Sequence, residues 1–290
     1  MATDRGNQIP AARRLKLPGI VPVELWDLEL PGGILWELQE RPDFPTLLLE
    51  ALEGLRRGTL VCRYSTPPLS GCRDFARVVL TGGAARDLPA STFPCQVLPG
   101  GAGGPARTLA AALGEGVWVL DVGQSTFKLA AGAAYFASPR NNASLPIRQP
   151  GTEARAIDGS QVDPAQQRRR LRDALFGLLA AAQQRLERPS LLVLALPCEL
   201  GESALPGGSS YIGMARDAAL ADDLAHAAGA PALVLNDAEL AAWAVGEGVA
   251  VGAEKVLVVT LGFAVGGAIL EPAAPGNGRR DFLARSRFMP

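Results

Sequence analysis

Histidine and cysteine are scarce in this chain of 290 residues, and their scarcity argues against most protein metal centres. The one histidine, His226, falls in an alanine-rich helical pattern. The cysteines form no C-x-x-C pair, so these residues predict no zinc site. We interpret them as reduced thiols of a cytoplasmic protein, because disulfides usually form in oxidising compartments. They are Cys62, Cys72, Cys95 and Cys198.

An excess of charge is also absent, since 28 basic residues balance 29 acidic ones. Nucleic-acid-binding proteins usually carry a basic excess, so we expect no nucleic-acid partner. The longest apolar run, residues 256–270, contains three glycines and is too short to span a membrane, so no membrane partner is expected. No early segment combines a basic start, an apolar run and a small-residue cleavage site, which argues against secretion.

Length and apolar content favour a globular protein of two domains. The chain is long enough for two domains of average size, and its hydrophobic share of 48% supplies a sizeable core. Residues 1–16 are polar and basic without periodicity, and we expect a flexible arm there. From residue 21 to residue 39, apolar and acidic residues alternate on both sides of Pro31-Gly32-Gly33, which predicts a β-hairpin.

Helical and strand patterns alternate along the rest of the chain. Thr46 and Gly58 are expected to begin and end a helix. A strand at residues 75–80 runs into the small-residue turn at Gly82. Such a turn either lets a flat ligand approach the backbone closely or is needed for packing alone. Asp163 is expected to start the clearest helix. Further helices are expected at residues 105–113 and 217–228 and after Asp237, strands at 191–196 and 232–235, and glycine- or proline-rich loops at 138–163 and 201–213.

The most informative stretch is residues 117–130, VWVLDVGQSTFKLA. An apolar strand ends on Asp121, a glycine turn follows at Gly123, and hydroxyl groups and Lys128 come next. A hairpin of this kind presents backbone N–H groups and hydroxyls to a phosphate, which predicts nucleotide chemistry. In the alternative interpretation, Asp121 is a turn residue that caps its own loop.

A second hairpin repeats this pattern near the end of the chain. Residues 255–260 and 264–270 read as two strands that flank Gly262. Strands and helices alternate around both hairpins. The repetition predicts an α/β protein made of two related halves.

Together these motifs resemble those of a known superfamily. DVGQSTFK, residues 121–128, is similar to the first phosphate loop of the actin, sugar kinase and Hsp70 superfamily, and TLGFAVGGAIL, residues 260–270, is similar to its second. VVLTGGAA, residues 78–85, looks like the adenosine loop. With VLALPCEL and PALVLNDAELAAWA, they resemble the ROK family (repressors, open reading frames and sugar kinases) over residues 46–270. The resemblance implies a two-domain, actin-like (ribonuclease H-like) ATPase fold.

The order of the motifs differs from the order in that family. There the first phosphate loop opens the chain and the adenosine loop closes it, whereas here the adenosine loop comes first. A circular permutation explains this order, with new termini after the strand that ends at Leu270. Residues 17–113 and 246–290 would then form the second half, and residues 114–245 the first. The alternative is an unrelated amino-terminal domain on a truncated kinase.

The resemblance implies ATP and Mg²⁺ as cofactors. Asp121 would hold Mg²⁺ through water, because hard cations favour carboxylate oxygens and Mg²⁺ keeps most of its waters. Lys128 would add positive charge if its side chain faces the cleft. The other residues that the resemblance assigns to the nucleotide are Gly123, Gln124, Ser125, Thr126, Gly262, Gly266, Gly82 and Gly83.

The resemblance assigns the reaction to the Asn-Asp pair after the strand at residues 232–235. Asp237 would be the general base, since phosphoryl transfer to an alcohol needs a carboxylate within hydrogen-bond reach of the attacking hydroxyl. Asn236 would hold a neighbouring hydroxyl. The pair would also cap the helix that begins at Ala238. The expected partner is a small-molecule sugar or polyol, with a homodimer as a candidate assembly.

Two departures from the family keep a second function open. Phe263 and Ala264 stand where the family has Thr-Gly after Gly262, which removes a hydroxyl donor and adds bulk beside the phosphates. The family's closely spaced cysteines and its histidine-containing sugar motif are absent. The first hypothesis is a sugar kinase, and the alternative is a non-catalytic relative that binds a nucleotide or sugar as a regulator or assembly partner. A repressor is not expected, because residues 1–45 show no helix-turn-helix pattern.

Overall fold

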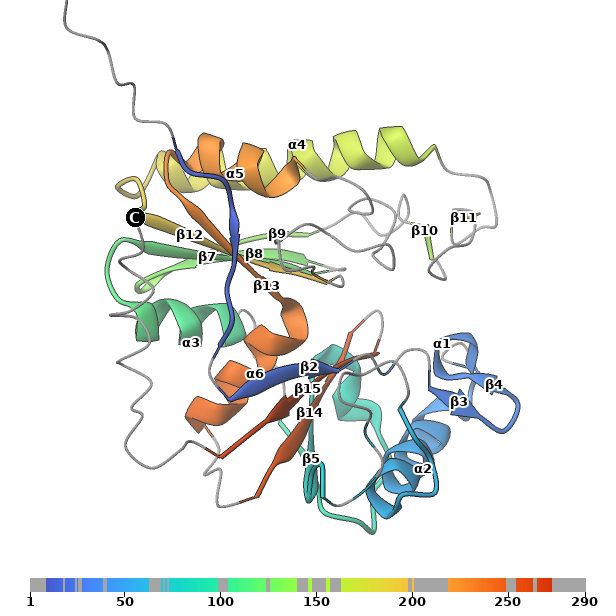
Figure 1. Cartoon of the computed structure of the whole chain (residues 1–290). Helices are drawn as coiled ribbons and strands as arrows, with labels where there is room; N and C mark the ends of the chain where they lie inside the picture. The colour runs from blue at the N-terminus through green and yellow to red at the C-terminus, as the bar shows by residue number, and fades with distance from the viewer. Residues whose placement is uncertain are drawn as a thin grey trace, which may run out of the picture. The chain divides into compact units, whose positions relative to one another are not determined.

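The computed structural model of the chain is drawn in Figure 1. The chain divides into two compact units, each an α/β assembly with its own main sheet. The first unit comprises Met1–Leu15 and Leu109–Asn236, and the second comprises Lys16–Thr108 and Asp237–Pro290. The structure describes residues 9–17, 19–23, 25, 28–38, 41–62, 69, 71, 73–98, 104–123, 126–139, 146–147, 155–156, 163–197, 200, 219–248, 254–262 and 265–272.

The main sheet of the first unit has six strands in the described part of the chain. In sheet order they are β1 (Arg13–Arg14), β13 (Ala232–Asn236), β12 (Leu191–Leu196), β7 (Val117–Val122), β8 (Thr126–Ala131) and β9 (Ala134–Pro139). β7, β8 and β9 form an antiparallel meander. β12 lies parallel to β7, β13 lies parallel to β12, and β1 lies parallel to β13 at the edge.

Burial follows from the position of each strand in this sheet. β7 is buried along its whole length and β12 along all but its first residue, as is usual for central strands covered on both faces. β9 lies at the edge and is only partly buried. The predicted strands at residues 117–121 and 191–196 are confirmed, and the first extends to Val122, because their continuous apolar runs suit central strands of a sheet.

Two helices cover one face of the first sheet, α4 (Pro164–Gln183) and α5 (Leu220–Ala228) (Figure 1). α4 begins after Asp163 as predicted, and Oδ1 of Asp163 accepts a hydrogen bond of 2.9 Å from the N–H of Ala165. Arg172 of α4 forms an ion pair with Asp223 of α5. The core under these helices consists of Trp118, Leu120, Val122, Phe127, Leu129, Leu171, Leu175, Leu178, Leu179, Ala182, Leu192, Leu194, Leu196, Leu220, Ala221, Leu224, Ala225, Ala228, Ala232 and Val234.

The segment before residue 16 is partly built into the first sheet. β1 pairs with β13, and the N–H of Leu15 donates to the carbonyl oxygen of Val234 at 2.7 Å. The N–H of Ala12 donates to Oδ1 of Asp222 at 2.6 Å. The expected flexible arm is therefore corrected for residues 9–15. An open sheet edge offers unpaired backbone groups, and sequence periodicity does not reveal which segment will use them.

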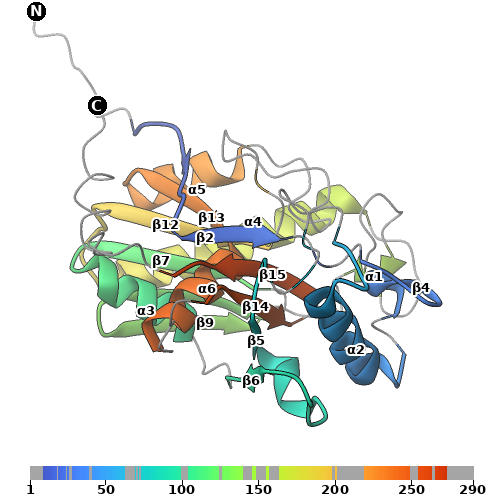
Figure 2. The ribbon, with the colours of Figure 1, turned by 60° about the horizontal axis from the view of Figure 1, so that its bottom comes forward.

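The main sheet of the second unit has five strands among the described residues. In sheet order they are β2 (Ile20–Val23), β15 (Val265–Leu270), β14 (Val256–Leu261), β5 (Arg77–Thr81) and β6 (Cys95–Val97). β14 and β15 form the second predicted hairpin, and β2 pairs antiparallel with β15. β5 lies parallel to β14, and β6 lies parallel to β5. Figure 2 shows β2, from the beginning of the chain, beside β15 from near its end.

The two main sheets share one strand order. In the first, the antiparallel strands β9, β8 and β7 are followed by the parallel strands β12 and β13, with β1 added at the edge. In the second, the antiparallel strands β2, β15 and β14 are followed by the parallel strands β5 and β6. The five strands follow one another along the chain in the first unit, whereas β2, β5 and β6 precede the hairpin of β14 and β15 in the second.

α2 (Phe44–Arg57) and α6 (Asp237–Gly248) are the longer helices assigned mainly to the second unit. α2 begins at Phe44 rather than at the predicted Thr46, and it ends as predicted at Gly58, which has a left-handed backbone with φ 77°. α6 packs on β14, β15 and β2. The hydrophobic core on the other face of the second main sheet includes Val23, Leu25, Leu28, Leu35, Leu48, Leu49, Ala51, Leu52, Leu55, Cys62, Leu69, Phe75, Val78, Leu80, Ala85, Phe93, Leu257, Val259, Leu261, Val265 and Ile269.

The predicted hairpin at residues 21–39 is wrong in its extent. β2 pairs with β15. Only β3 (Glu29–Leu30) and β4 (Gly33–Ile34) pair with each other, and the short helix α1 (Leu35–Leu38) follows. The physical reason is that Ile20 and Val23 are buried when β2 joins the sheet, which a local hairpin could not achieve.

Shorter elements complete the described chain. A 3₁₀ helix (Gly83–Asp87) follows β5, and α3 (Gly104–Leu113) leads from the second unit to β7 of the first. β10 (Pro146–Ile147) and β11 (Arg155–Ala156) pair within the predicted loop at residues 138–163. The predicted loop at residues 201–213 lies outside the described residues. No helix in the described part of the chain is long and apolar enough to cross a membrane.

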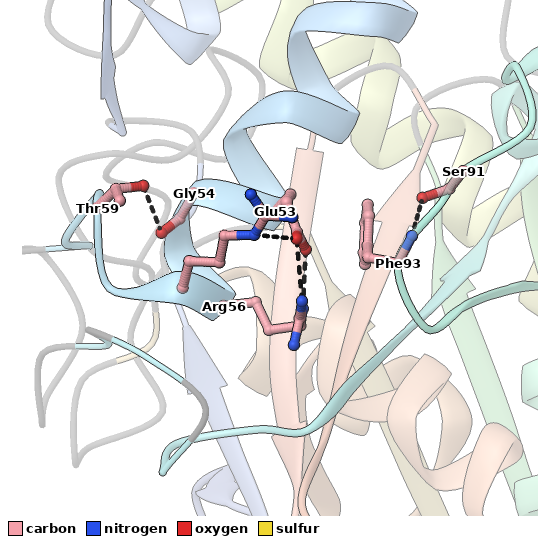
Figure 3. Close-up of polar contacts among 7 residues, drawn as sticks. Glu53, Gly54, Arg56, Thr59, Ser91 and Phe93 are labelled. Atoms are coloured by element: carbon pink, nitrogen blue, oxygen red, sulfur yellow. Dashed lines mark hydrogen bonds and ion pairs between the residues drawn. The ribbon is translucent and has the colours of Figure 1, made fainter.

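The last turns of α2 carry a cluster of charged contacts, drawn in Figure 3. Glu53 accepts hydrogen bonds from Nε of Arg56 at 2.8 Å and from Nη2 at 2.9 Å, and it also forms an ion pair with Arg57. Oγ1 of Thr59 donates to the carbonyl oxygen of Gly54 at 3.1 Å. The hydrogen bonds from Arg56 and the charges of both arginines lower the pKa of Glu53.

Candidate active site

Asp121 and Asn236 lie at the same edge of the first sheet. β7, β12 and β13 are parallel, so their carboxyl ends meet at one edge, where α/β proteins commonly bind ligands. In the register of the sheet, Asp121 of β7 pairs with Ala195 of β12, and Ala195 pairs with Leu235 of β13. Leu235 directly precedes Asn236. Two strand spacings, about 10 Å, therefore separate the backbones of Asp121 and Asn236.

Asp121 projects from the face of the first sheet that is opposite to α4 and α5. Its neighbours Leu120 and Val122 belong to the core under those helices, and side chains alternate between the two faces along a strand. Asp121 is only 7% exposed. A carboxylate buried to this degree needs a counter-charge or hydrogen-bond donors.

Lys128 supplies such a counter-charge from the next strand. Asp121 and Lys128 are cross-strand partners in β7 and β8, and Nζ of Lys128 donates to Oδ2 of Asp121 at 2.9 Å. The sequence left the direction of the Lys128 side chain open, and the structure places it on the face that carries Asp121. The hairpin therefore presents a carboxylate and an ammonium group side by side.

Gly123 begins the turn of this hairpin. A Cβ at this position would lie 2.7 Å from the carbonyl oxygen of Thr126 and 3.6 Å from Nζ of Lys128. A side chain would push the two strands apart, so the close approach requires glycine. Thr126 begins β8 and is partly buried. Gln124 and Ser125, which the family resemblance assigns to the phosphates, lie outside the described residues.

In the second unit, the predicted adenosine loop and second phosphate loop are in backbone contact. Gly82 has φ 103°, and a Cβ there would collide with the backbone oxygen of Leu261 and lie 2.7 Å from its carbonyl carbon. A Cβ at Gly83 or Gly262, in contrast, would meet no described atom within 4 Å. Packing thus requires glycine at position 82, whereas glycine at positions 83 and 262 leaves backbone open to a ligand.

The start of α6 lies beside the hairpin of β14 and β15. A Cβ at Gly266 would lie 2.6 Å from Oγ1 of Thr260 and 3.4 Å from Cβ of Ala238. Asp237 and Glu239 flank Ala238 in the first turn of α6, where the helix dipole favours negative charge. Asp237 is therefore the residue next to Ala238, whose side chain faces Gly266.

Sequence reasoning missed two threonines and a carboxylate. Thr81 and Thr260 are level with each other at the ends of β5 and β14, and Thr81 is buried. The signal that could have found them is their position, one residue before Gly82 and two residues before Gly262. Glu239 is only 2% exposed. It follows Asn236 by three residues, which is the spacing of a capping box.

The residues around Asp121 fit a magnesium ion that arrives with a nucleotide. No group of three or more histidine, cysteine or acidic side chains that could hold a metal occurs among the described residues. A single carboxylate is nevertheless a usual protein contribution when substrate phosphates and water supply the other ligands. The donor set therefore suits a magnesium–nucleotide complex better than a metal ion held by protein alone.

The described thiols are poor nucleophiles in this fold. Cys62 and Cys95 are present as thiols, and burial raises the pKa of Cys95 to about 11. A thiol with this pKa stays protonated near neutral pH. Cys72 and Cys198 lie outside the described residues.

No family model matches the chain, and no curated protein matches its sequence. Among solved structures, the chain is similar to an inorganic polyphosphate/ATP-glucomannokinase from Arthrobacter sp. strain KM, with 20% sequence identity and a TM-score of 0.37. The match covers 53% of this chain and 58% of that protein, so it spans a little over half the length of each.

Proposed function

We propose that this chain is an ATP- and Mg²⁺-dependent kinase that phosphorylates a hydroxyl of a sugar or similar small polyol. The observation that carries the proposal is the buried carboxylate of Asp121, beside a glycine turn, at the sheet edge that also carries Asn236. The contact between Gly82 and Leu261 supports it further, because it joins the two loops that the ROK resemblance assigns to the nucleotide.

In the first unit, the hairpin of β7 and β8 would bind the phosphates. Backbone N–H groups of residues 123–126 and the hydroxyl of Thr126 would donate to phosphate oxygens. Asp121 would hold the waters of a magnesium ion, and the bound metal would neutralise charge on the transferred phosphoryl group. In the second unit, Gly83 and Gly262 would let the nucleotide approach the backbone closely.

Asp237 is the proposed general base. It would accept the proton of the acceptor hydroxyl while that oxygen attacks the terminal phosphorus of ATP, with ADP as the leaving group. Asn236 would hold a neighbouring hydroxyl through its side-chain amide. Asn236 ends β13 and Asp237 begins α6, so both residues stand at the carboxyl end of a parallel strand. This is where α/β folds commonly place reacting groups.

We propose as well that the chain is a circular permutation of the ROK order. The proposal is supported by the strand order that the two main sheets share. In the second sheet, β2 comes from the beginning of the chain, whereas β14 and β15 come from near its end. α3 then joins the second unit to β7 of the first. Such rejoining is tolerated when original termini lie at the surface.

A non-catalytic relative is the second candidate. It is favoured by the pairing of Asp121 with Lys128, which neutralises the carboxylate without a metal. It is also favoured by Phe263 and Ala264 in the second phosphate loop, where a hydroxyl donor and a glycine are expected. Such a protein would bind a nucleotide or sugar and act as a regulator or assembly partner.

A screen of ATP consumption against a panel of sugars and polyols, with and without Mg²⁺, tests the proposal. We expect ADP formation that requires both Mg²⁺ and one class of acceptor. Melting temperatures measured on the same panel separate the two candidates, because a ligand that binds the folded chain raises the melting temperature whether or not it is turned over. Stabilisation without turnover by any acceptor would favour the non-catalytic relative.

A further inference from the structure

The ion pair of Lys128 and Asp121 competes with the proposed role of Asp121. Nζ of Lys128 lies 2.9 Å from Oδ2 of Asp121, and the two side chains are 27% and 9% exposed. The charge of this carboxylate is therefore already balanced inside the protein. A magnesium ion and an ammonium group both need the lone pairs of the same carboxylate, so either one weakens the binding of the other.

Lys128 also lies beside the turn that is proposed to hold the phosphates. Its Nζ would be 3.6 Å from a Cβ at Gly123, which places the ammonium group next to the turn. Lysine carries its charge on a flexible four-carbon stem, so the ammonium group can change partners without a backbone movement. A phosphate at the turn would offer it an acceptor with more charge than one carboxylate has.

We propose that Lys128 is an exchangeable counter-ion of Asp121. Its ammonium group holds the carboxylate until a magnesium–nucleotide complex binds, then moves to a phosphate oxygen, and Asp121 turns to the waters of the metal. No covalent bond changes in this exchange. It makes magnesium bind together with the nucleotide rather than before it. The inference rests on the proposed nucleotide site and describes how that site exchanges its charges.

The small number of lysines makes the exchange directly observable. The chain has three, Lys16, Lys128 and Lys255. Full-length protein labelled with ¹³C,¹⁵N-lysine should give three side-chain signals in nuclear magnetic resonance spectra, which single lysine-to-arginine variants assign. We expect the Lys128 signal to shift when Asp121 is changed to asparagine, and to shift in the wild type when ATP and Mg²⁺ are added. The signals of the other two lysines should stay in place.

Binding of ATP, with Mg²⁺ and with a chelator, tests the same exchange by calorimetry. Lys128→Met should weaken both affinities by about tenfold or more, as the loss of a charge-assisted hydrogen bond does. Asp121→Asn should abolish the gain from Mg²⁺ while leaving the metal-free affinity at or above that of the wild type, because Lys128 is then released. Lys255→Met is the matched control, since Lys255 also holds a carboxylate, that of Glu271, at 2.9 Å. It should change neither affinity.

The outcomes separate this inference from the proposed function. If ATP and Mg²⁺ bind but the Lys128 signal does not move, or if Lys128→Met keeps both wild-type affinities, the exchange is wrong even when the protein turns over ATP. If the Lys128 signal moves and no acceptor is phosphorylated, the kinase proposal fails and the exchange stands. If wild-type protein binds neither ATP nor tripolyphosphate, the exchange has no phosphate partner and is also wrong. The wild-type spectra give these answers even if Lys128→Met does not fold.

Discussion

Gly82 packs so closely on the backbone of Leu261 that a Cβ added at position 82 would lie 2.7 Å from the carbonyl carbon of Leu261. Gly82 follows β5 and Leu261 ends β14, and these strands are parallel neighbours. The contact fixes two turns that are far apart in the sequence against each other at one edge of the second sheet. A ligand that approaches both turns would therefore meet a preformed backbone surface.

Gly82→Ala should destabilise the protein. The substitution forces a Cβ into the backbone of Leu261 and places alanine at φ 103°, so we expect a loss of at least about 2 kcal/mol of unfolding free energy. Gly83→Ala is the matched control, because a Cβ there meets no described atom within 4 Å, and it should change stability by less than about 0.5 kcal/mol. Urea unfolding measures both. Equal stability of the two variants would contradict the described contact.

Asp237→Asn should abolish phosphoryl transfer and spare nucleotide binding. Asparagine keeps the size and helix-starting ability of aspartate but cannot accept the acceptor proton, so we expect kcat to fall about 10²- to 10⁴-fold. Affinity for ATP, measured by calorimetry, should stay within about twofold of the wild type. Asp222→Asn, in the first turn of α5, is the matched control and should keep full turnover. Unchanged turnover in Asp237→Asn would rule out this residue as the base.

Glu53→Gln should reduce stability at neutral pH and have no effect in acid. The partners of Glu53 lower its pKa below 4.5, so its ionised form stabilises the fold above that pH, and the stabilisation is lost as the pH falls through the folded-state pKa. The glutamate side chain is 17% exposed, and we expect a loss of up to about 1 kcal/mol at pH 7. Urea unfolding from pH 7 to about pH 3 should show this difference vanish. Glu50→Gln, at an exposed position of α2, is the control, and a difference for Glu53→Gln that persists in acid would contradict this account.

Cys95 should resist alkylation in the folded protein. Burial raises its pKa to about 11, so the thiolate fraction at pH 8 is roughly a hundred times smaller than for an ordinary cysteine. Iodoacetamide labelling followed by peptide mass spectrometry should therefore show slow modification of Cys95 in buffer and rapid modification in urea. Equal rates under the two conditions would show that burial does not protect this thiol.

Most of the local structure could be predicted, because it depends on patterns within a few residues. The hairpin of β7 and β8 and the helix that follows Asp163 are found where apolar periodicity, glycine turns and capping residues indicate them. The partner of β2 could not be predicted in this way. Residues 20–23 are all apolar and do not specify a partner strand, and the sheet edge that they join is β15, far along the chain.

The sequence by itself determined which residues we propose to carry chemistry in the candidate site. Asp121, Asn236 and Asp237 follow apolar strands, and the glycine turns that accompany them are visible without any coordinates. Only the tertiary structure decided what these groups meet. The register of β7 and β8 places Lys128 on Asp121, and the parallel pairing of β5 and β14 places Gly82 against Leu261. Local patterns specify turns and periodicity, whereas strand register and sheet neighbours depend on surfaces that exist only after distant segments have packed together.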